Sequence, residues 1–315
     1  MRSNPRRSVV YSVNAASCSS HCYLAFVVFR LGAKMDRSEK DAMLKAISGR
    51  ISKCTIPICK SMGNNLEVGT AVLVEIGNRL FAVTCNHTIP ANQGEIWMIS
   101  SKPVARSHYI HNELVIDSWK PAESWPDGGV VELDLENTRK LLEPHFEPLD
   151  LAEISLSFNP DRLAVVSGFP GQLVDSKDIS EDSSGRKMSF GFQGILIPGE
   201  PISQDKWPQP KSPSPDTHSD VDIFLPYQEG EVVEVQYQET RFDQAQSHPG
   251  GLSGGGIWQA RPYEGGVWSP ELRLVGIQCR SLPSKYLRGI RIRFVIELLA
   301  SIDEQIASEV QSLLE

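Results

Sequence analysis

The sequence of 315 residues contains no apolar run near the roughly 20 residues that span a bilayer. We therefore expect no membrane association. Acidic residues are missing from residues 1–34, which hold five basic side chains, so the rest of the chain carries a net charge of −13. Such an excess of acids argues against a broad nucleic-acid-binding face.

Cysteine is sparse, and none of the six cysteines forms a paired C-x2-C framework of the kind that binds zinc. Cys54 and Cys59 could bridge in an oxidising compartment, but free thiols in a reducing cytosol are the simpler interpretation, so we expect a cytoplasmic protein. His108 and His111 have no convincing third metal ligand, and phosphate-loop motifs are absent. We therefore expect neither a metal nor a cofactor.

Residues 1–34 do not fit a secretory signal, because their apolar patch is short and is interrupted at Arg30. Their composition is similar to that of an organellar transit peptide, yet Met35 opens an amphipathic helical pattern and could be the true start of the gene. We expect residues 1–34 to be a disordered or mis-assigned tail, followed by an N-terminal helix over residues 35–50.

From Ile51 onward, short runs of Val, Ile, Leu and Thr alternate with turn residues, a pattern typical of an all-β sandwich or barrel. The clearest pair of strands, Gly69 to Ile76 and Arg79 to Thr84, is joined by Gly77-Asn78 in a tight hairpin. About a dozen strands suit two small barrels. The other predicted strands span residues 95–99, 114–118, 130–135, 163–167, 188–197, 221–225, 231–237, 256–259, 272–279 and 289–292.

These patterns divide the chain into consecutive units. We expect a first β-barrel over residues 51–150 and a second over residues 151–293. An exposed proline-rich loop at residues 199–220 interrupts the second barrel. Apolar residues recur at helical spacing from Phe294 to the end, which predicts a C-terminal helix over residues 294–315.

Five glycines surround one serine in the stretch His248-Pro249-Gly250-Gly251-Leu252-Ser253-Gly254-Gly255-Gly256. Glycine reaches dihedrals closed to other residues, so such a loop can aim a hydroxyl and nearby N–H groups at one point. An acyl-transfer nucleophile needs this arrangement. A glycine-rich hairpin turn is the alternative interpretation.

A serine nucleophile needs a base, and His87 stands at the end of a predicted strand. The segments Val68-Gly69-Thr70-Ala71-Val72-Leu73-Val74 and Phe81-Ala82-Val83-Thr84-Cys85-Asn86-His87 resemble the G-T-G-F-L-V and L-T-A-A-H segments of trypsin-like serine proteases. Gly251-Leu252-Ser253-Gly254-Gly255 is similar to their G-D-S-G-G. The resemblance implies the chymotrypsin fold of the PA clan: two six-stranded antiparallel β-barrels with a C-terminal α-helix.

The third member of the implied triad should lie between the histidine and the serine. Asp127-Gly128-Gly129-Val130-Val131-Glu132-Leu133 resembles the family segment D-I-A-V-L-E-L, so the resemblance implies a triad of His87, Asp127 and Ser253. Two other aspartates compete for the role. Asp117 lies inside a predicted strand, and Asp134 lies in an alternating segment that favours a solvated face.

The resemblance also implies the surroundings of the triad. The N–H groups of Gly251 and Ser253 would form the oxyanion hole. Leu252 replaces an aspartate that pairs with a freed N-terminal amine in zymogen-type members, which predicts an enzyme that needs no such cleavage. Ser247 would lie near the base of the specificity pocket, and Gln278, Cys279 and Ser281 would line the substrate channel.

The residues and the resemblance together favour a serine endopeptidase acting on protein or peptide substrates. Two alternatives remain: a catalytically silent module for peptide binding or regulation, and a small-ester hydrolase. A cytoplasmic protease that is not a zymogen needs restraint, so we expect a regulatory partner protein, as in bacterial stress or defence systems.

Overall fold

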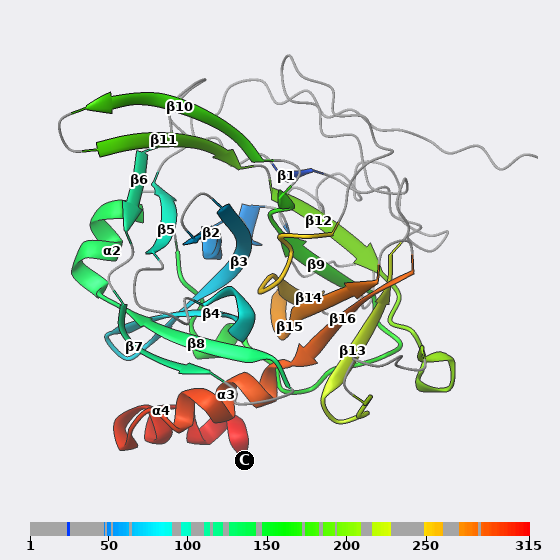
Figure 1. Ribbon diagram of the computed structural model, residues 1–315. Coiled ribbons are helices and arrows are strands. Elements are labelled where there is room, and N and C mark those ends of the chain that lie inside the picture. Colours follow the sequence, from blue (N-terminus) through cyan, green and yellow to red (C-terminus); the bar gives the residue numbers. More distant parts are fainter. Residues whose placement is uncertain are drawn as a thin grey trace, which may run out of the picture.

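Two largely antiparallel β-sheets and a pair of C-terminal helices make up this protein in its computed structural model (Figure 1). The structure describes residues 24–25, 47, 49–51, 53–62, 65–89, 96–101, 110–113, 116–121, 126–142, 147–171, 174–182, 185–192, 194–208, 216–227, 249–260, 271–282 and 285–315. The predicted all-β fold with a helical C-terminus is confirmed. Within this described part, no helix is both long and apolar enough to cross a membrane.

The first sheet pairs seven strands in the order β6-β5-β2-β3-β4-β8-β7. Its centre is the predicted hairpin, with Gly77-Asn78 as the turn between β3 and β4. The strands are β2 (Thr55–Met62), β3 (Asn65–Ile76), β4 (Arg79–Cys85), β5 (Ile96–Ser101), β6 (Ile110–Glu113), β7 (Ile116–Pro121) and β8 (Gly128–Leu133).

The second sheet also pairs seven strands, in the order β1-β12-β9-β14-β15-β16-β13. Six of them pair antiparallel, and the two-residue β1 adds a seventh strand parallel to β12. The expected number was six in each unit. The strands are β1 (Leu24–Ala25), β9 (Ala164–Gly168), β12 (Gly194–Gly199), β13 (Asp222–Pro226), β14 (Gly256–Ala260), β15 (Leu272–Leu282) and β16 (Tyr286–Arg291).

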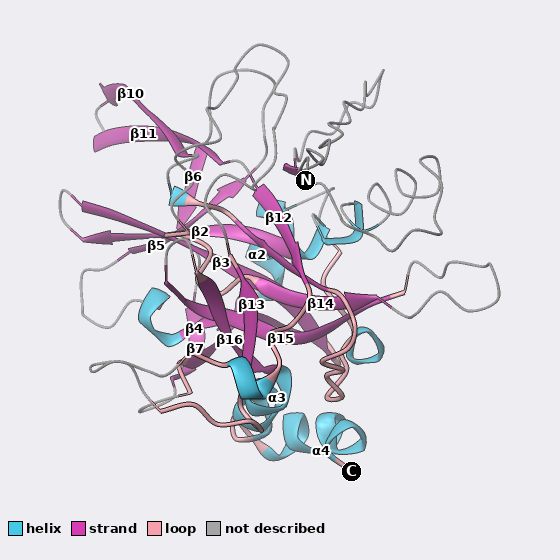
Figure 2. Ribbon diagram, turned by 90° about the vertical axis from the view of Figure 1, so that its right-hand side faces the viewer, coloured by secondary structure: helices cyan, strands magenta, loops and turns pink. Residues whose placement is uncertain are grey.

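A separate two-stranded hairpin, β10 (Val174–Asp182) with β11 (Gly185–Phe192), lies at the opposite end of the molecule from the C-terminal helices (Figures 1 and 2). The strand predicted over residues 188–197 is thus two strands, because β11 pairs with β10 whereas β12 pairs with β9. The strand predicted over residues 231–237 lies outside the described residues.

The described helices are short. α2 (Leu135–Leu142) follows β8, and α3 (Ile292–Ala300) and α4 (Glu304–Leu314) replace the single predicted C-terminal helix. Asp303 separates the last two because its side chain accepts the N–H of Ile306 at 3.0 Å and so caps a new helix. The 3-10 turns are η1 (Asn86–Thr88), η2 (Leu151–Glu153) and η4 (Gln204–Lys206), the last within the predicted proline-rich loop.

Three clusters of buried apolar side chains hold these layers together. One lies within the first sheet and includes Leu73 and Val131, and a second lies within the second sheet and includes Val166. The third joins the two sheets, and it contains Phe81, Trp258 and the buried faces of α3 and α4. Any site between the sheets is therefore held in a fixed geometry by this third cluster.

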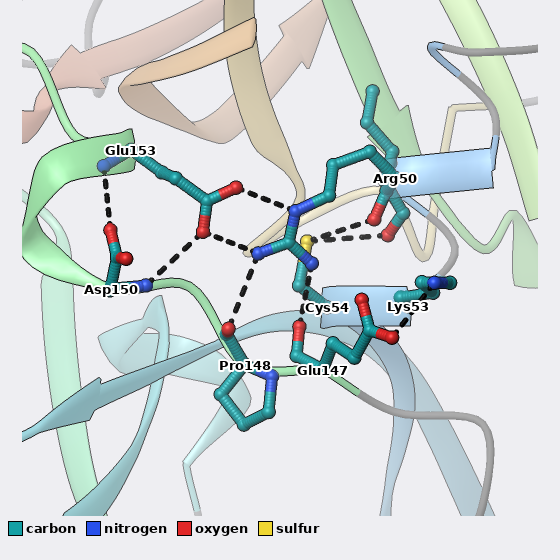
Figure 3. A network of polar contacts seen from close by, with 8 residues as sticks. Arg50, Lys53, Cys54, Glu147, Pro148, Asp150 and Glu153 are labelled. Atoms are coloured by element: carbon teal, nitrogen blue, oxygen red, sulfur yellow. Dashed lines mark hydrogen bonds and ion pairs between the residues drawn. The ribbon is translucent and has the colours of Figure 1, made fainter. Parts of the chain in front are cut away.

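The described residues between 47 and 54 are helical, and Arg50 ties them to the connection between the sheets. Its Nε and Nη2 donate to the Glu153 carboxylate at 2.6 and 2.5 Å, and its Nη1 and Nη2 donate to the carbonyls of Glu147 and Pro148 at 2.8 and 3.2 Å (Figure 3). Glu153 also accepts the N–H of Asp150 at 3.2 Å, so one guanidinium organises the start of η2.

Replacing Arg50 with methionine is expected to lower the free energy of unfolding by about 2 kcal/mol, because it removes the guanidinium that donates to Glu153 and to two carbonyls. Although burial raises the pKa of Glu153, hydrogen bonds and attraction to Arg50 outweigh it and hold that pKa below its ordinary value. The contribution of this pair is therefore present above the ordinary pKa and is lost as the pH falls through the lowered value. Urea denaturation at neutral and acidic pH measures both effects.

Lys53→Met supplies the matched control for that experiment. The Lys53 amine pairs with Glu147 at 2.8 Å, but both side chains are largely exposed, so its loss should cost less than about 0.5 kcal/mol. Equal destabilisation by the two substitutions would contradict the role given to Arg50.

Candidate active site

His87 lies in the middle of η1, the single turn that follows β4. Two hydroxyls fix this turn: Thr88 Oγ1 donates to the carbonyl of Cys85 at 2.7 Å, and it lies 2.8 Å from Thr84 Oγ1. Ile89 N–H closes the turn on the Asn86 carbonyl at 3.0 Å. The imidazole therefore projects from a rigid turn with its side chain 48% exposed.

Asp127 contacts His87 with both carboxylate oxygens. Oδ2 lies 2.6 Å from His87 Nδ1, and Oδ1 accepts the His87 backbone N–H at 3.3 Å. A carboxylate can only accept, so Nδ1 donates and Nε2 is the basic nitrogen of the ring. The arrangement orients the imidazole as a base directed away from Asp127.

Strand register decides which of the three aspartates meets the histidine. Asp127 directly precedes β8, whose first residue pairs with the last residue of β4, just before the His87 turn. Asp134 directly follows the other end of β8, and Asp117 lies in a register shift of β7 beside that same end. Six residues at about 3.3 Å each place that end roughly 20 Å away. The structure thus brings Asp127 to His87 and keeps Asp117 and Asp134 apart from it.

The loop that carries Ser253 is fastened to both sheets. Thr70 of β3 donates its N–H to the Ser253 carbonyl at 2.8 Å and its hydroxyl to the Gly251 carbonyl at 2.9 Å. From the other side, Gly254 N–H donates to the Gln278 carbonyl of β15 at 2.8 Å. Ser253 is half-buried in the middle of this loop, between the two sheets.

Two contacts of Gly254, the residue after Ser253, connect the serine loop to the histidine turn. The Gln278 carbonyl that accepts the Gly254 N–H also accepts from Cys85 Sγ at 3.1 Å. Gly254 in turn packs against Thr84. Because Thr84 and Cys85 immediately precede η1, the serine loop and His87 share one junction between the sheets.

Two of the loop glycines occupy backbone conformations that L side chains rarely adopt, with φ of 99° at Gly251 and 89° at Gly254. Space is also absent, because a Cβ at Gly254 would lie 1.9 Å from the Thr70 carbonyl oxygen, and one at Gly251 would lie 2.4 Å from the Gly171 nitrogen. The glycines therefore serve the close approach of this loop to β3 at Gly254 and to the segment after β9 at Gly251, and not a hairpin turn.

Gly254→Ala is expected to lower the free energy of unfolding by about 2–6 kcal/mol, since backbone strain and overpacking each cost about 1–3 kcal/mol. Thermal and urea denaturation measure the loss. Gly49→Ala is the control, because a Cβ there meets nothing within 4 Å. A Gly254→Ala variant as stable as Gly49→Ala would contradict the packing described above.

The predicted oxyanion donors lie at the start and the middle of the same turn. Pro249 O accepts the Leu252 N–H at 3.2 Å, and Leu252 O accepts the Gly255 N–H at 2.8 Å, which fixes the peptide planes between them. Across the described part of the chain, the N–H groups of Gly251 and Ser253 donate no hydrogen bond.

The predicted substrate-binding residues fall in different places. Ser247 lies outside the described residues. Gln278 and Cys279 are buried in β15, where Gln278 Nε2 donates to the Arg280 carbonyl at 2.9 Å and Cys279 Sγ donates to the Asp127 carbonyl at 3.4 Å. Ser281 is half-buried two residues farther along the same strand.

Sequence reasoning missed three residues of this junction: Thr70, Thr84 and Cys85. All three are fully buried. The two threonines carry hydroxyls within the apolar segments of residues 69–74 in β3 and 80–85 in β4, which was the available signal. Burial raises the pKa of the Cys85 thiol well above its ordinary value, and contact with the Cys279 sulfur raises it further. Cys85 therefore remains protonated near neutral pH and is no rival to Ser253 as nucleophile.

The chain matches no protein-family model and no curated protein sequence. Solved structures similar to it include the protease Anisep from Arthrobacter nicotinovorans, at 12% identity and a TM-score of 0.45 over 76% of this chain and 90% of that one. A serine endoprotease from Yersinia pestis shows 13% identity and a TM-score of 0.44 over 84% and 66%. A thermostable serine protease, AL20, from an extremophilic microorganism shows 9% and 0.43 over 76% and 91%.

Proposed function

We propose that this chain is a serine endopeptidase whose triad consists of Ser253, His87 and Asp127. The observation that carries the proposal is the 2.6 Å contact between His87 Nδ1 and Asp127 Oδ2, at the junction where the serine loop is fastened to both sheets. A base held in a defined tautomer beside a serine in a rigid loop is the arrangement that acyl transfer requires.

In the proposed reaction, Ser253 Oγ attacks the scissile carbonyl carbon while His87 Nε2 accepts the hydroxyl proton. The Asp127 carboxylate stabilises the imidazolium that forms. The N–H groups of Gly251 and Ser253 receive the developing oxyanion. The intermediate then expels the amine, which takes the proton from His87. In the second half of the reaction, water attacks the acyl-enzyme while His87 accepts its proton, and Ser253 Oγ leaves with that proton.

We further propose that the enzyme is competent without cleavage of its N-terminus. Leu252 supports this, because its side chain is fully buried in the apolar cluster of the second sheet and packs against Gly168. Apolar packing therefore fixes the residue before Ser253, where zymogen-type relatives of the family would use an ion pair. Ser247, Gln278, Cys279 and Ser281 remain proposed substrate-binding residues, and a regulatory partner protein remains a proposal.

A fluorophosphonate probe tests the nucleophile directly. The wild-type protein should become covalently labelled at Ser253, and Ser253→Ala should abolish labelling. Ser301→Ala is the matched control, because Ser301 ends α3 and its hydroxyl donates only locally, to the Leu298 carbonyl. Labelling that persists in Ser253→Ala would reject the assignment of the nucleophile. Folded wild-type protein that is neither labelled nor active on a peptide library would favour the catalytically silent module.

A further inference from the structure

A buried thiol lies directly beside the His87–Asp127 pair, and the proposed reaction does not use it. Cys85 Sγ, a ring nitrogen of His87 and a carboxylate oxygen of Asp127 all lie within 4.8 Å of one another. In the L-T-A-A-H segment that this region resembles, alanine stands at the position of Cys85. The thiol is therefore an addition to the triad and has no part in its chemistry.

Thiolate, imidazole and carboxylate are the three ligand types that Zn²⁺ prefers in proteins. Metal–ligand bonds of about 2.0–2.3 Å place tetrahedral ligand atoms about 3.3–3.7 Å apart, so side-chain shifts of about 1 Å or less would complete the set. His87 is 48% exposed, so an ion can reach the imidazole from solvent, and water would supply the fourth ligand of a tetrahedral set. We infer that Cys85, His87 and Asp127 form a binding site for Zn²⁺, and that its occupation inhibits the enzyme.

Inhibition follows from the proton balance of coordination. The Cys85 thiol releases its proton to solvent and binds as thiolate. His87 binds through Nδ1, so the ring proton moves from Nδ1 to Nε2. A ring protonated at Nε2 cannot accept the proton of Ser253, and the ion also separates Nδ1 from the Asp127 carboxylate. The metal thus removes both the base and its orienting group without contacting the serine.

The inference also assigns a use to the cysteine for an enzyme that needs no N-terminal cleavage. Reversible binding of Zn²⁺ would keep the enzyme inactive, as the propeptide does in a zymogen. The inhibitory half of the inference rests on the proposed function, whereas the binding half does not. Its test therefore needs a readout that is independent of hydrolysis.

Co²⁺ supplies that readout, because a cobalt–thiolate bond produces a near-ultraviolet charge-transfer band whether or not the protein is an enzyme. Reduced full-length protein is titrated with Co²⁺, and the band should appear in wild type and be lost in Cys85→Ala. Cys54→Ala is the control: Cys54 is also fully buried, with Sγ donating to the carbonyls of Arg50 and Ile51, away from the triad. A band that is absent from wild type, or unchanged in Cys85→Ala, overturns the site.

Zn²⁺ inhibition tests the second half with the same three proteins. Inhibition is measured for each protein relative to its own metal-free rate, and Cys85→Ala should require at least about tenfold more Zn²⁺ for half-inhibition, since even outer-shell changes cost about 10–100-fold in metal affinity. Equal inhibition of wild type and Cys85→Ala overturns the inhibitory site. If no variant hydrolyses any substrate, the proposed function fails, while the Co²⁺ band still decides the binding site. Thermal denaturation establishes that Cys85→Ala is folded, and Cys85→Ser replaces it if it is not.

Discussion

Ser253→Ala is expected to reduce kcat for peptide hydrolysis by about 10⁴–10⁶-fold, because it removes the atom that forms the acyl-enzyme. The fold should be unaffected. Ser253 is half-buried, and its carbonyl accepts the backbone N–H of Thr70, a hydrogen bond that alanine keeps. Steady-state kinetics with a fluorogenic peptide measure the loss of kcat, and denaturation of the same preparation measures stability.

The residual rate of peptide hydrolysis by Ser253→Ala tests the proposed oxyanion hole. The N–H groups of Gly251 and Ser253 remain in Ser253→Ala, so a slow background hydrolysis above that in water is expected from the oxyanion hole and from binding. A variant that retains more than about a tenth of wild-type kcat would reject Ser253 as nucleophile. Comparing ester and amide substrates of equal side chain in the wild type then separates an endopeptidase from a small-ester hydrolase.

Asp127→Asn is expected to lower kcat by about 10³–10⁴-fold with little change in KM. The substitution keeps the shape of the side chain, but it replaces an oxygen 2.6 Å from His87 Nδ1 with a group that can be an amide donor. The ring would then accept at Nδ1 and carry its proton on Nε2, the wrong tautomer for a base.

Asp117→Asn and Asp134→Asn are the matched controls for this prediction. Both remove one carboxylate, but both residues lie at the end of β8 that is remote from His87, so both variants should retain activity. A loss of activity in either control as large as that in Asp127→Asn would contradict the triad. The comparison also separates a specific contact from the general effect of removing one negative charge.

The hydrophobic pattern of the sequence predicted the central strands well. It failed at strand ends that are set by pairing with strands far away in the sequence. The alternation across Asp134 suggested that the strand continues to residue 135, yet β8 ends at Leu133, whose partner in β4 is Leu80. Beyond that point, the Asp134 carbonyl accepts the Thr138 N–H and α2 begins. The sequence of residues 130–135 does not indicate that the pairing of β8 with β4 stops at Leu133.

Strand β2 was not predicted from the sequence, and it contains a proline, Pro57. Pro57 argues against a strand over residues 55–62, but β2 forms there, because its pairing with β5 starts only at Ile58. Pro57 therefore lies just beyond the described pairing with β5, so its missing N–H removes no hydrogen bond from that pairing. This tolerance depends on the pairing with β5 stopping at Ile99, which the sequence around Pro57 does not specify.

The sequence by itself determined the chemical types of the candidate site: a glycine-framed serine, a histidine at a strand end and an acid before an apolar strand. It did not determine which acid meets the histidine, because Asp117, Asp127 and Asp134 differ mainly in register, and register is set by pairing between strands about 40 residues apart. Only the tertiary structure decided that choice. It also placed Thr70, Thr84 and Cys85 against a loop about 180 residues away, because such long-range contacts arise when two sheets pack around a shared core.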